Sequence, residues 1–333
     1  MNEQITIEKR AAHEYFFRIG LAILVLRVLN TGIQYGVQLL IKSISPDLYR
    51  SLVEGPWFLW VLSLAPLYLI ALPAFYLILP KKPIKYTAKK LKFGNTAGSC
   101  ISCVPLMYIG NIIGIVFVGI LSLLIGKPID NGLTSMIGAS PVWVVVLCAV
   151  IIAPIGEEFI FRKLIVDRLA PFGEARAVLF SGLVFGLFHG NFNQFFYTFM
   201  IGCVLAFAYI KTKNLLAPII MHMFFNLLGG VIAPYVASPE IIEALERLLE
   251  NPTDVSPDTL TVILPAMLFA FIMGALFIAG IALIIIKSVF VAKRKFPAPE
   301  ILVDGGASLS LWSNTAVIAA ISVMAITFIF SII

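Results

Sequence analysis

The stretch VVVLCAVIIAPIGEEFIFRKLIV, residues 144–166, is apolar enough to cross a bilayer, yet it carries the adjacent carboxylates Glu157 and Glu158. An ionised carboxylate at membrane depth costs at least ~2.5–3.5 kcal/mol by insertion measurements. An adjacent pair therefore needs a reason to be there. Proton chemistry and the binding of water or a metal ion are both functional reasons, so this stretch predicts a site within a membrane helix.

The composition places the whole chain in a membrane. Of its 333 residues, 60% are hydrophobic and 13% are charged, whereas a soluble domain has about 25% charged residues. A spanning helix needs roughly 20 apolar residues. We expect spans near 17–41, 56–79, 98–125, 141–163, 177–190, 194–210, 215–235, 260–286 and 310–333, the fifth and sixth of them short. The prediction is an all-α, polytopic bundle of eight to nine transmembrane helices.

The placement of charge predicts the orientation. The net charge is +6, but the basic residues gather in short loops at 81–93, 211–213 and 287–295, while 236–258 is acidic. This pattern argues for a membrane protein and against a nucleic-acid partner, because positive charge accumulates in cytoplasmic loops. The three basic loops follow spans two, six and eight, on one side of the membrane. The loop after span four joins them, and the N-terminus is predicted to be cytosolic.

The chain divides into four predicted segments. Residues 1–97 form a transmembrane pair with a basic cytosolic loop, and 98–235 form a compact series of spans that carries every candidate catalytic group. Residues 236–258 are an acidic extracytoplasmic loop with a short amphipathic helix, and 259–333 add two further spans. No cleavable signal peptide is expected, because the first apolar stretch is too long for one. We expect a multi-pass protein of a bacterial cell membrane.

Spacing separates the two carboxylates. Glu158 and Arg162 are four residues apart, so on a helix they face each other and can form an ion pair. Glu157 points about 100° away and is predicted to be the freer carboxylate. Pro154 and Gly156 precede the pair and predict a bend, which is either a packing kink or a widened turn that opens the carboxylates to water.

Two histidines share this apolar part of the chain. His189 and His222 lie inside predicted spans, whereas His13 lies in the charged N-terminal segment and is expected to be solvated. Counting about 1.5 Å per residue from the cytosolic ends places His222 about 10 Å and His189 about 18 Å deep. Asn226 follows His222 by one turn on the same face. Two intramembrane histidines with two glutamates and a polar amide indicate a site.

These side chains suit hydrolysis. A carboxylate and a histidine can hold and deprotonate a water molecule, while a second histidine and an amide stabilise an oxyanion. A divalent metal such as zinc could share this task, with Glu157, His189 and His222 as its candidate ligands. The sequence has no H-E-x-x-H motif and no convincing serine elbow, which disfavours zincin and serine mechanisms.

The chain resembles the CPBP family, which comprises type II CAAX prenyl endopeptidases and bacteriocin-processing and self-immunity membrane proteins. The three motifs of that family appear in order as Glu157-Glu158-x-x-x-Arg162, Phe185-x-x-x-His189 and His222-x-x-x-Asn226, within about 141–235. The resemblance implies that Glu157 is the general base, supported by Glu158 and Arg162. It further implies that His189 binds the water and that His222 and Asn226 stabilise the oxyanion, with Asn193 as an additional candidate.

The leading hypothesis is an intramembrane endopeptidase with a site facing the cytosol. Its partners would be the lipid bilayer and a membrane-embedded or lipid-associated peptide or protein substrate. One alternative is a non-catalytic bacteriocin self-immunity protein, and another is a proton-coupled transporter, because intramembrane Glu and His also serve proton relays. Arg27 lies inside the first span, where it is expected to snorkel or to pair with a carboxylate.

Overall fold

The computed structural model describes residues 5–82, 93–129, 132–253, 256–292, 301–303 and 311–330. Within these ranges the regular structure is helical except for two strands of three residues each. The predicted all-α membrane bundle is therefore confirmed. Most of the predicted basic loop at 81–93, and residues 293–295 of the loop at 287–295, lie outside the described residues.

Seven helical stretches of the described chain are long and apolar enough to cross a membrane. They are Lys9–Ile44, Phe58–Ile78, Ala97–Ile125, Val142–Phe172, Phe192–Thr212, Leu216–Val236 and Pro257–Ile286. The other two predicted spans are shorter than the roughly 20 residues that a crossing requires. Helix α10 (Glu174–Phe188) has 15 residues, and α17 (Thr315–Phe330) has 16. Two shorter helices thus occupy the remaining predicted positions in the described chain, and α10 is bounded by Gly173 and by the turn at Gly190.

The remaining elements follow the chain in a simple order. They are β1 (Ile5–Ile7), α1 (Lys9–Ile44), α2 (Pro46–Glu54), α3 (Phe58–Ala65), η1 (Pro66–Ala71), α4 (Leu72–Ile78), α5 (Phe93–Ile125), α6 (Gly132–Gly138), α7 (Val142–Val145), η2 (Val146–Ile152), α8 (Ala153–Glu158), η3 (Phe159–Val166), α9 (Asp167–Leu169), η4 (Ala170–Phe172), α11 (Phe192–Thr212), α12 (Leu216–Leu227), η5 (Leu228–Ile232), α13 (Ala233–Val236), α14 (Pro239–Glu250), α15 (Pro257–Ala292) and β2 (Ile301–Val303). Segments η1, η2, η3 and η5 are π-helical, with wider turns than an α-helix.

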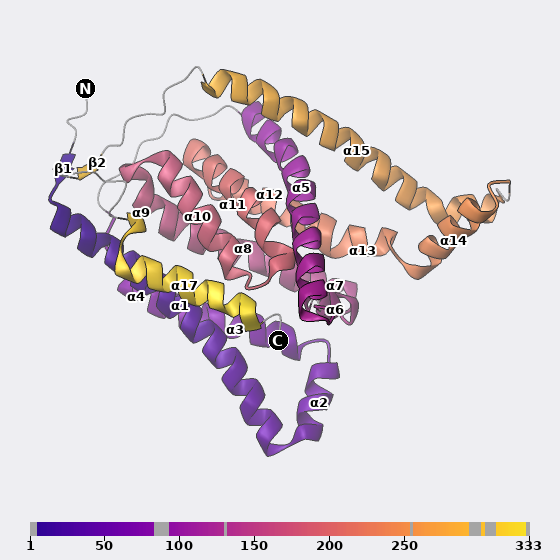
Figure 1. Ribbon diagram of the computed structural model, residues 1–333, viewed down its shortest axis with the longest axis horizontal. Coiled ribbons are helices and arrows are strands. Elements are labelled where there is room, and N and C mark those ends of the chain that lie inside the picture. Colours follow the sequence, from indigo (N-terminus) through magenta and orange to yellow (C-terminus); the bar gives the residue numbers. More distant parts are fainter. Residues whose placement is uncertain are drawn as a thin grey trace.

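The centre of the bundle is a hairpin of α10 and α11. Helix α5 packs on α11, and α15 packs in turn on α5. On the other side, α1 runs alongside α17, so that helices from the two ends of the chain lie side by side (Figure 1). A large apolar core joins α1, η1, η3, α10 and α17, and includes Phe16, Phe75, Phe161, Phe180 and Phe185. The outer helices thereby build part of the surroundings of α10.

Charged and polar residues at the helix ends of the described chain meet at one end of the bundle. Arg18 donates to the carbonyl of Ile78 at 3.0 Å, and Arg168 donates to the carbonyl of Pro80 at 2.7 Å. The hydroxyl of Tyr209 donates to the Asp167 carboxylate at 2.8 Å. Lys211 pairs with Glu174, and β1 pairs with β2 in parallel register. The described residues next to spans one, two, four and six thus lie on one side, as the charge pattern predicted.

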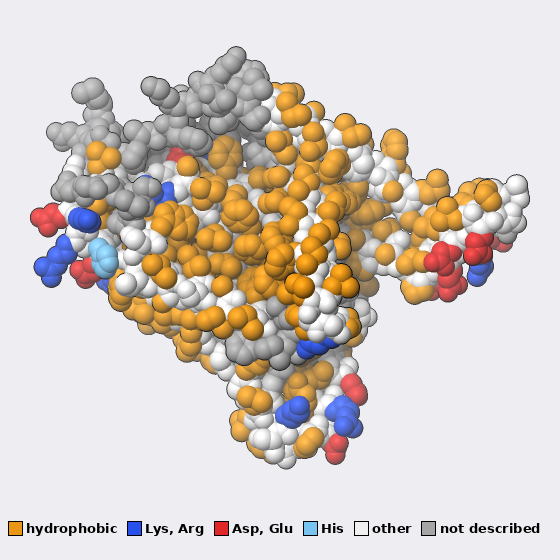
Figure 2. Space-filling model, viewed as in Figure 1, with side chains coloured by type: hydrophobic (Ala, Val, Ile, Leu, Met, Phe, Trp, Pro, Cys, Tyr) orange, Lys and Arg blue, Asp and Glu red, His pale blue; other side chains and the backbone are white. Residues whose placement is uncertain are grey.

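Charge and apolar surface are separated on the outside of the molecule. Figure 2 shows hydrophobic side chains over the middle of the visible face, with charged ones near the start of α1, on α2 and on α14. Helix α14 is the predicted amphipathic helix: it buries Ile241 and Ala244 and leaves the pair Glu243 and Arg247 largely exposed. This distribution matches an apolar belt between two polar surfaces.

Candidate active site

The glutamate pair lies on a short α-helical segment between two wide turns. Segment α8, which ends at Glu158, is preceded by the π-helical η2 and followed by the π-helical η3. Proline at the start of α8 cannot donate a backbone hydrogen bond, and π-helical turns are frequent at functional sites. The wide turns therefore flank the segment that holds Pro154 and Gly156, and that segment is itself α-helical.

Glu158 is held by Arg162 in the interior of the protein. The arginine Nε donates to Oε2 at 2.7 Å and Nη2 donates to Oε1 at 3.1 Å, and neither side chain has any exposed surface. The third nitrogen of the guanidinium, Nη1, donates to Ser181 Oγ at 2.8 Å. The predicted ion pair is confirmed. Its fork geometry neutralises Glu158 and leaves that carboxylate little capacity to bind water.

His222 joins the two carboxylates. Its Nδ1 lies 3.0 Å from Glu158 Oε1, and its Nε2 lies 3.8 Å from Glu157 Oε2. A paired carboxylate only accepts, so Nδ1 carries the hydrogen and Nε2 faces Glu157. The Glu157 side chain is 16% exposed, whereas the Glu158 side chain is fully buried. Glu157 is therefore the less buried of the two carboxylates, as its helical position predicted.

The ring of Phe185 connects the charged groups with both histidines. The Arg162 guanidinium lies 4.8 Å from its centroid, and the rings of His189 and His222 meet it edge-on at 4.9 and 5.5 Å. The Nδ1 of His189 is 2.8 Å from the carbonyl of Phe185. Because a carbonyl only accepts, this nitrogen is the donor, and Nε2 of His189 presents a lone pair.

Asn226 lies on the same face of α12 as His222, and its amide reaches a neighbouring helix. Its Nδ2 donates to the carbonyl of Ala149, in the π-helical segment η2, at 2.8 Å. A side-chain amide nitrogen carries two hydrogens, so this bond leaves a second N–H for another acceptor. Asn226 thus ties α12 to the helix of the glutamates, a role that its position one turn after His222 did not predict.

Three further features of the site had no signal in the sequence. The Ser181 hydroxyl accepts a hydrogen bond from Arg162. Tyr68 packs so closely on Gly156 that a Cβ at position 156 would lie 2.1 Å from the tyrosine ring. Tyr68 also donates to the carbonyl of Ala153 at 3.2 Å. Each contact joins segments that are distant in sequence, so no local spacing reveals it.

The asparagine that shapes the turn after His189 is Asn191. Its side chain accepts from the backbone N–H of Gln194 at 2.9 Å and so caps α11, and its Nδ2 donates to the carbonyl of His189 at 3.1 Å. The predicted additional candidate, Asn193, is half-buried in the first turn of the same helix. Asn191 rather than Asn193 caps the helix, because the N-cap residue immediately precedes the first helical residue.

The candidate metal ligands do not converge. Among the described residues, no three or more His, Cys, Asp or Glu side chains are grouped so that they could hold a metal ion. The Glu158 carboxylate is already paired with Arg162, and the Nδ1 of His222 bonds the same carboxylate. The predicted set of Glu157, His189 and His222 is thus not assembled here, and its use for zinc stays a prediction.

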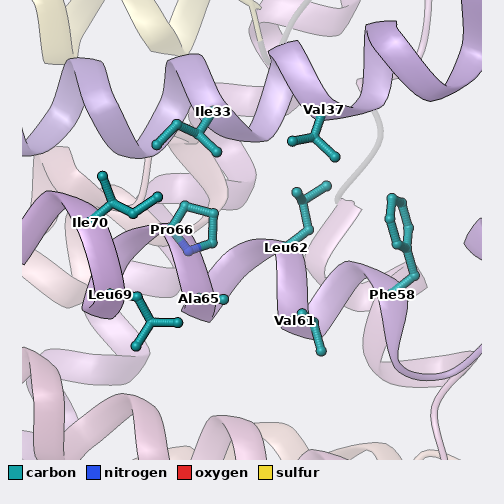
Figure 3. Close-up of a pocket in the computed structure, with 9 residues that line it drawn as sticks. All are labelled: Ile33, Val37, Phe58, Val61, Leu62, Ala65, Pro66, Leu69 and Ile70. Atoms are coloured by element: carbon teal, nitrogen blue, oxygen red, sulfur yellow. The ribbon is translucent and has the colours of Figure 1, made fainter.

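An apolar groove of about 250 Å³ lies apart from these polar groups. Figure 3 shows that it runs between α1, with Ile33 and Val37, and the stretch of α3 and η1, with Leu62, Pro66 and Ile70. All its lining side chains are apolar. A groove without a polar group offers no chemistry to a reacting bond, so it does not compete with the glutamate site.

Comparison with known proteins independently supports the resemblance to CAAX-type membrane proteases. Residues 139–228 match the family described as type II CAAX prenyl endopeptidase Rce1-like. The chain is 35% identical over 102 residues to the membrane-embedded CAAX protease MroQ of Staphylococcus aureus, covering 28% of this chain and 40% of the relative. It is 32% identical over 123 residues to human CAAX prenyl protease 2, covering 31% and 35%.

A third relative is the putative membrane peptidase YdiL of Bacillus subtilis, 32% identical over 108 residues that cover 31% of this chain and 42% of the relative. The chain thus spans less than half the length of each of these three proteins. No solved structure shows a significant match. The matched segment contains all six predicted catalytic residues.

Proposed function

Residues 139–228 belong to the CPBP family of CAAX-type membrane proteases, as the three motifs predicted, and from this premise we propose that the protein is an intramembrane endopeptidase. One observation carries the proposal. Glu157 is partly exposed at 16% and lies 3.8 Å from His222, whose other nitrogen is engaged by the fully buried Glu158. The site thus offers one available carboxylate beside an oriented imidazole.

In the proposed reaction, Glu157 activates a water molecule. The water oxygen attacks the carbonyl carbon of the peptide bond while Glu157 takes its proton, which forms a tetrahedral oxyanion. His189 accepts a hydrogen bond from the same water through Nε2. The C–N bond then breaks, the proton passes from Glu157 to the departing amine, and one water has been added across the bond.

The oxyanion is assigned to His222 and Asn226. As an imidazolium, His222 donates through both ring nitrogens, so it can bind Glu158 through Nδ1 and the oxyanion through Nε2. The second N–H of Asn226 is available for the same oxygen. Donors that are fixed before the reaction stabilise developing charge most effectively, and the bonds to Glu158 and Ala149 provide this fixation.

We assign the opening of the site to the cytosolic half of the membrane. The described parts of the basic loops lie at one end of the bundle, and positive charge accumulates on the cytosolic side. Glu157 is ten residues from Asp167 at that end, which is at most about 15 Å along a helix. The substrate would be a membrane-embedded or lipid-associated peptide or protein that presents its bond to this half of the bilayer.

The decisive experiment compares Glu157→Gln with Glu240→Gln in reconstituted vesicles. Both changes remove one carboxylate charge and keep the side-chain volume, but Glu240 is an exposed residue at the start of α14. Loss of a general base costs about 10²–10⁴-fold in rate. We expect this loss for Glu157→Gln alone, measured on membrane-anchored peptides with a fluorophore and a quencher on either side of the bond.

Full cleavage by folded Glu157→Gln protein would refute the proposal. Protection against an antimicrobial peptide that persists in Glu157→Gln, without cleavage by the wild type, would support the self-immunity alternative. Proton-coupled uptake into vesicles would support the transporter. Comparative membrane proteomics of cells with wild type and Glu157→Gln then identifies the substrate as the peptide terminus that disappears in the variant.

A further inference from the structure

Arg27 is a buried cation in the middle of α1, outside the segment that matches the family. Only 8% of the residue is exposed. Its Nη1 donates to the carbonyl of Phe188 at 2.7 Å, and its Nη2 donates to Thr327 Oγ1 at 2.7 Å. These partners are 161 and 300 residues away in sequence, so one guanidinium joins α1, the end of α10 and α17.

In the described part of the chain, the arginine is buried and pairs with no carboxylate, contrary to both sequence expectations. None of the ion pairs among the described residues includes Arg27. Its Nε is buried without a hydrogen-bond partner in the described part of the chain. A buried charge without a counter-ion is costly, so its retention calls for a specific benefit.

The carbonyl that Arg27 binds belongs to the last turn of α10. The last carbonyls of a helix lack internal partners and carry partial negative charge, which a cation stabilises. The guanidinium also lies 5.5 Å from the centroid of the Phe188 ring. His189 follows Phe188 directly, so the arginine contacts the backbone and the ring of the residue next to a candidate catalytic histidine.

The turn after His189 is built around the same guanidinium. Gly190 has φ +68, which disfavours other residues, and its N–H bonds the carbonyl of Leu187 at 3.1 Å. A Cβ at Gly190 would lie 2.5 Å from Nη2 of Arg27. The backbone conformation of this turn and the close approach of the cation therefore both favour glycine.

We propose that Arg27 is a positioning residue for His189, supplied by α1 and secured by α17. Two contacts fix the direction of the His189 ring. Its Nδ1 bonds the Phe185 carbonyl within α10, and Arg27 holds the end of α10 by bonding the Phe188 carbonyl. Without the clamp, the last turn of a short helix can fray and the ring loses its direction. This inference rests on the proposed function, because it assigns a reason for the orientation of His189.

The test uses Arg27→Met, Arg27→Lys and the matched control Arg18→Met. Arg18 lies in the same helix and also donates from its guanidinium to a backbone carbonyl, but it is exposed and lies at the charged end. A misplacement of about 1 Å can cost 10²-fold in rate. We expect a fall in kcat of roughly 10–100-fold for Arg27→Met with KM within about twofold, partial recovery in Arg27→Lys, and wild-type values for Arg18→Met.

A second measurement does not depend on cleavage. Diethyl pyrocarbonate modifies histidines, and mass spectrometry of the intact membrane protein compares its rates at His189 and His222. Arg27→Met should change the rate at His189 severalfold and leave the rate at His222 unchanged. This ratio stays readable if the protein has no peptidase activity, so failure of the proposed function and failure of the clamp are distinguishable.

Thr327→Val covers the case in which Arg27→Met does not fold. This variant removes one arm of the clamp and keeps the cation. We expect it to change both kcat and the His189 rate by less than Arg27→Met but measurably. Wild-type values of kcat and of the modification ratio in folded Thr327→Val and Arg27→Lys, or an equal change at both histidines, would overturn the proposal.

Discussion

Replacing Arg162 by Met is expected to destabilise the protein strongly, because it leaves Glu158 charged and buried. Both side chains are fully buried, and Arg162 makes two bonds to Glu158 and one to Ser181. Met has a comparable length and is apolar, so the change removes the charge more than the packing. Breaking a buried ion pair by removing one partner costs about 3–5 kcal/mol. We expect a loss of this size in the free energy of unfolding.

The chain contains a matched control for this change. Glu243 and Arg247 form the same i,i+4 pair on α14, but their side chains are 64% and 73% exposed and 3.5 Å apart. Exposed helix pairs contribute about 0.3–0.5 kcal/mol, so Arg247→Met should have a small effect. The comparison isolates burial, since residue types, spacing and order are the same.

The assay is reversible unfolding in mixed micelles, in which sodium dodecyl sulfate is titrated and helicity is followed by circular dichroism. The double variant Glu158→Gln/Arg162→Met removes both charges and should recover a large part of the lost stability, because the buried carboxylate that has lost its arginine is gone. If Arg162→Met costs no more than Arg247→Met, or if the double variant is no better than the single one, the reasoning from the buried pair is wrong.

Two further predictions concern the same site. Gly156→Ala should leave the free energy of unfolding within about 1 kcal/mol of wild type, since the gain in helix propensity offsets the lost hydrogen bond of Tyr68. The same variant should have a lower kcat, because the new Cβ displaces Tyr68 from the turn that carries Glu157. A kcat equal to wild type in folded Gly156→Ala would contradict this reasoning. A chelator such as 1,10-phenanthroline should leave the cleavage rate unchanged if the chain's own groups suffice. Loss of activity that zinc restores would instead support Glu157, His189 and His222 as metal ligands.

Much of the fold follows from local patterns. Apolar runs of about 20 residues located seven of the spans, and the basic loops predicted which connections share a side. The interaction of Glu158 with Arg162 was predictable because four residues return a helix to the same face. The partial exposure of Glu157 followed from the same geometry, since it points about 100° away.

The boundaries of α10 followed from the sequence, whereas α17 begins later than predicted. Polar residues separate α10 from α11 in the sequence, and the predicted spans 177–190 and 194–210 placed this break within two residues of the observed helix ends. A single glycine with a positive φ decides that boundary. The π-helical turns around the glutamates likewise depend on how Pro154 and the neighbouring helices are accommodated.

The sequence by itself therefore determined the membrane bundle, the common side of the basic loops, the pairing of Glu158 with Arg162 and the family motifs, because all of these depend on residues within a few helical turns or on composition. Only the tertiary structure decided that His222 lies between two glutamates 64 and 65 positions away, that Tyr68 covers Gly156, and that Arg27 holds the end of α10. Those contacts depend on how each helix is rotated and how deep it lies beside its neighbours. Such rotations are set by packing over the whole bundle, and no single segment carries that information.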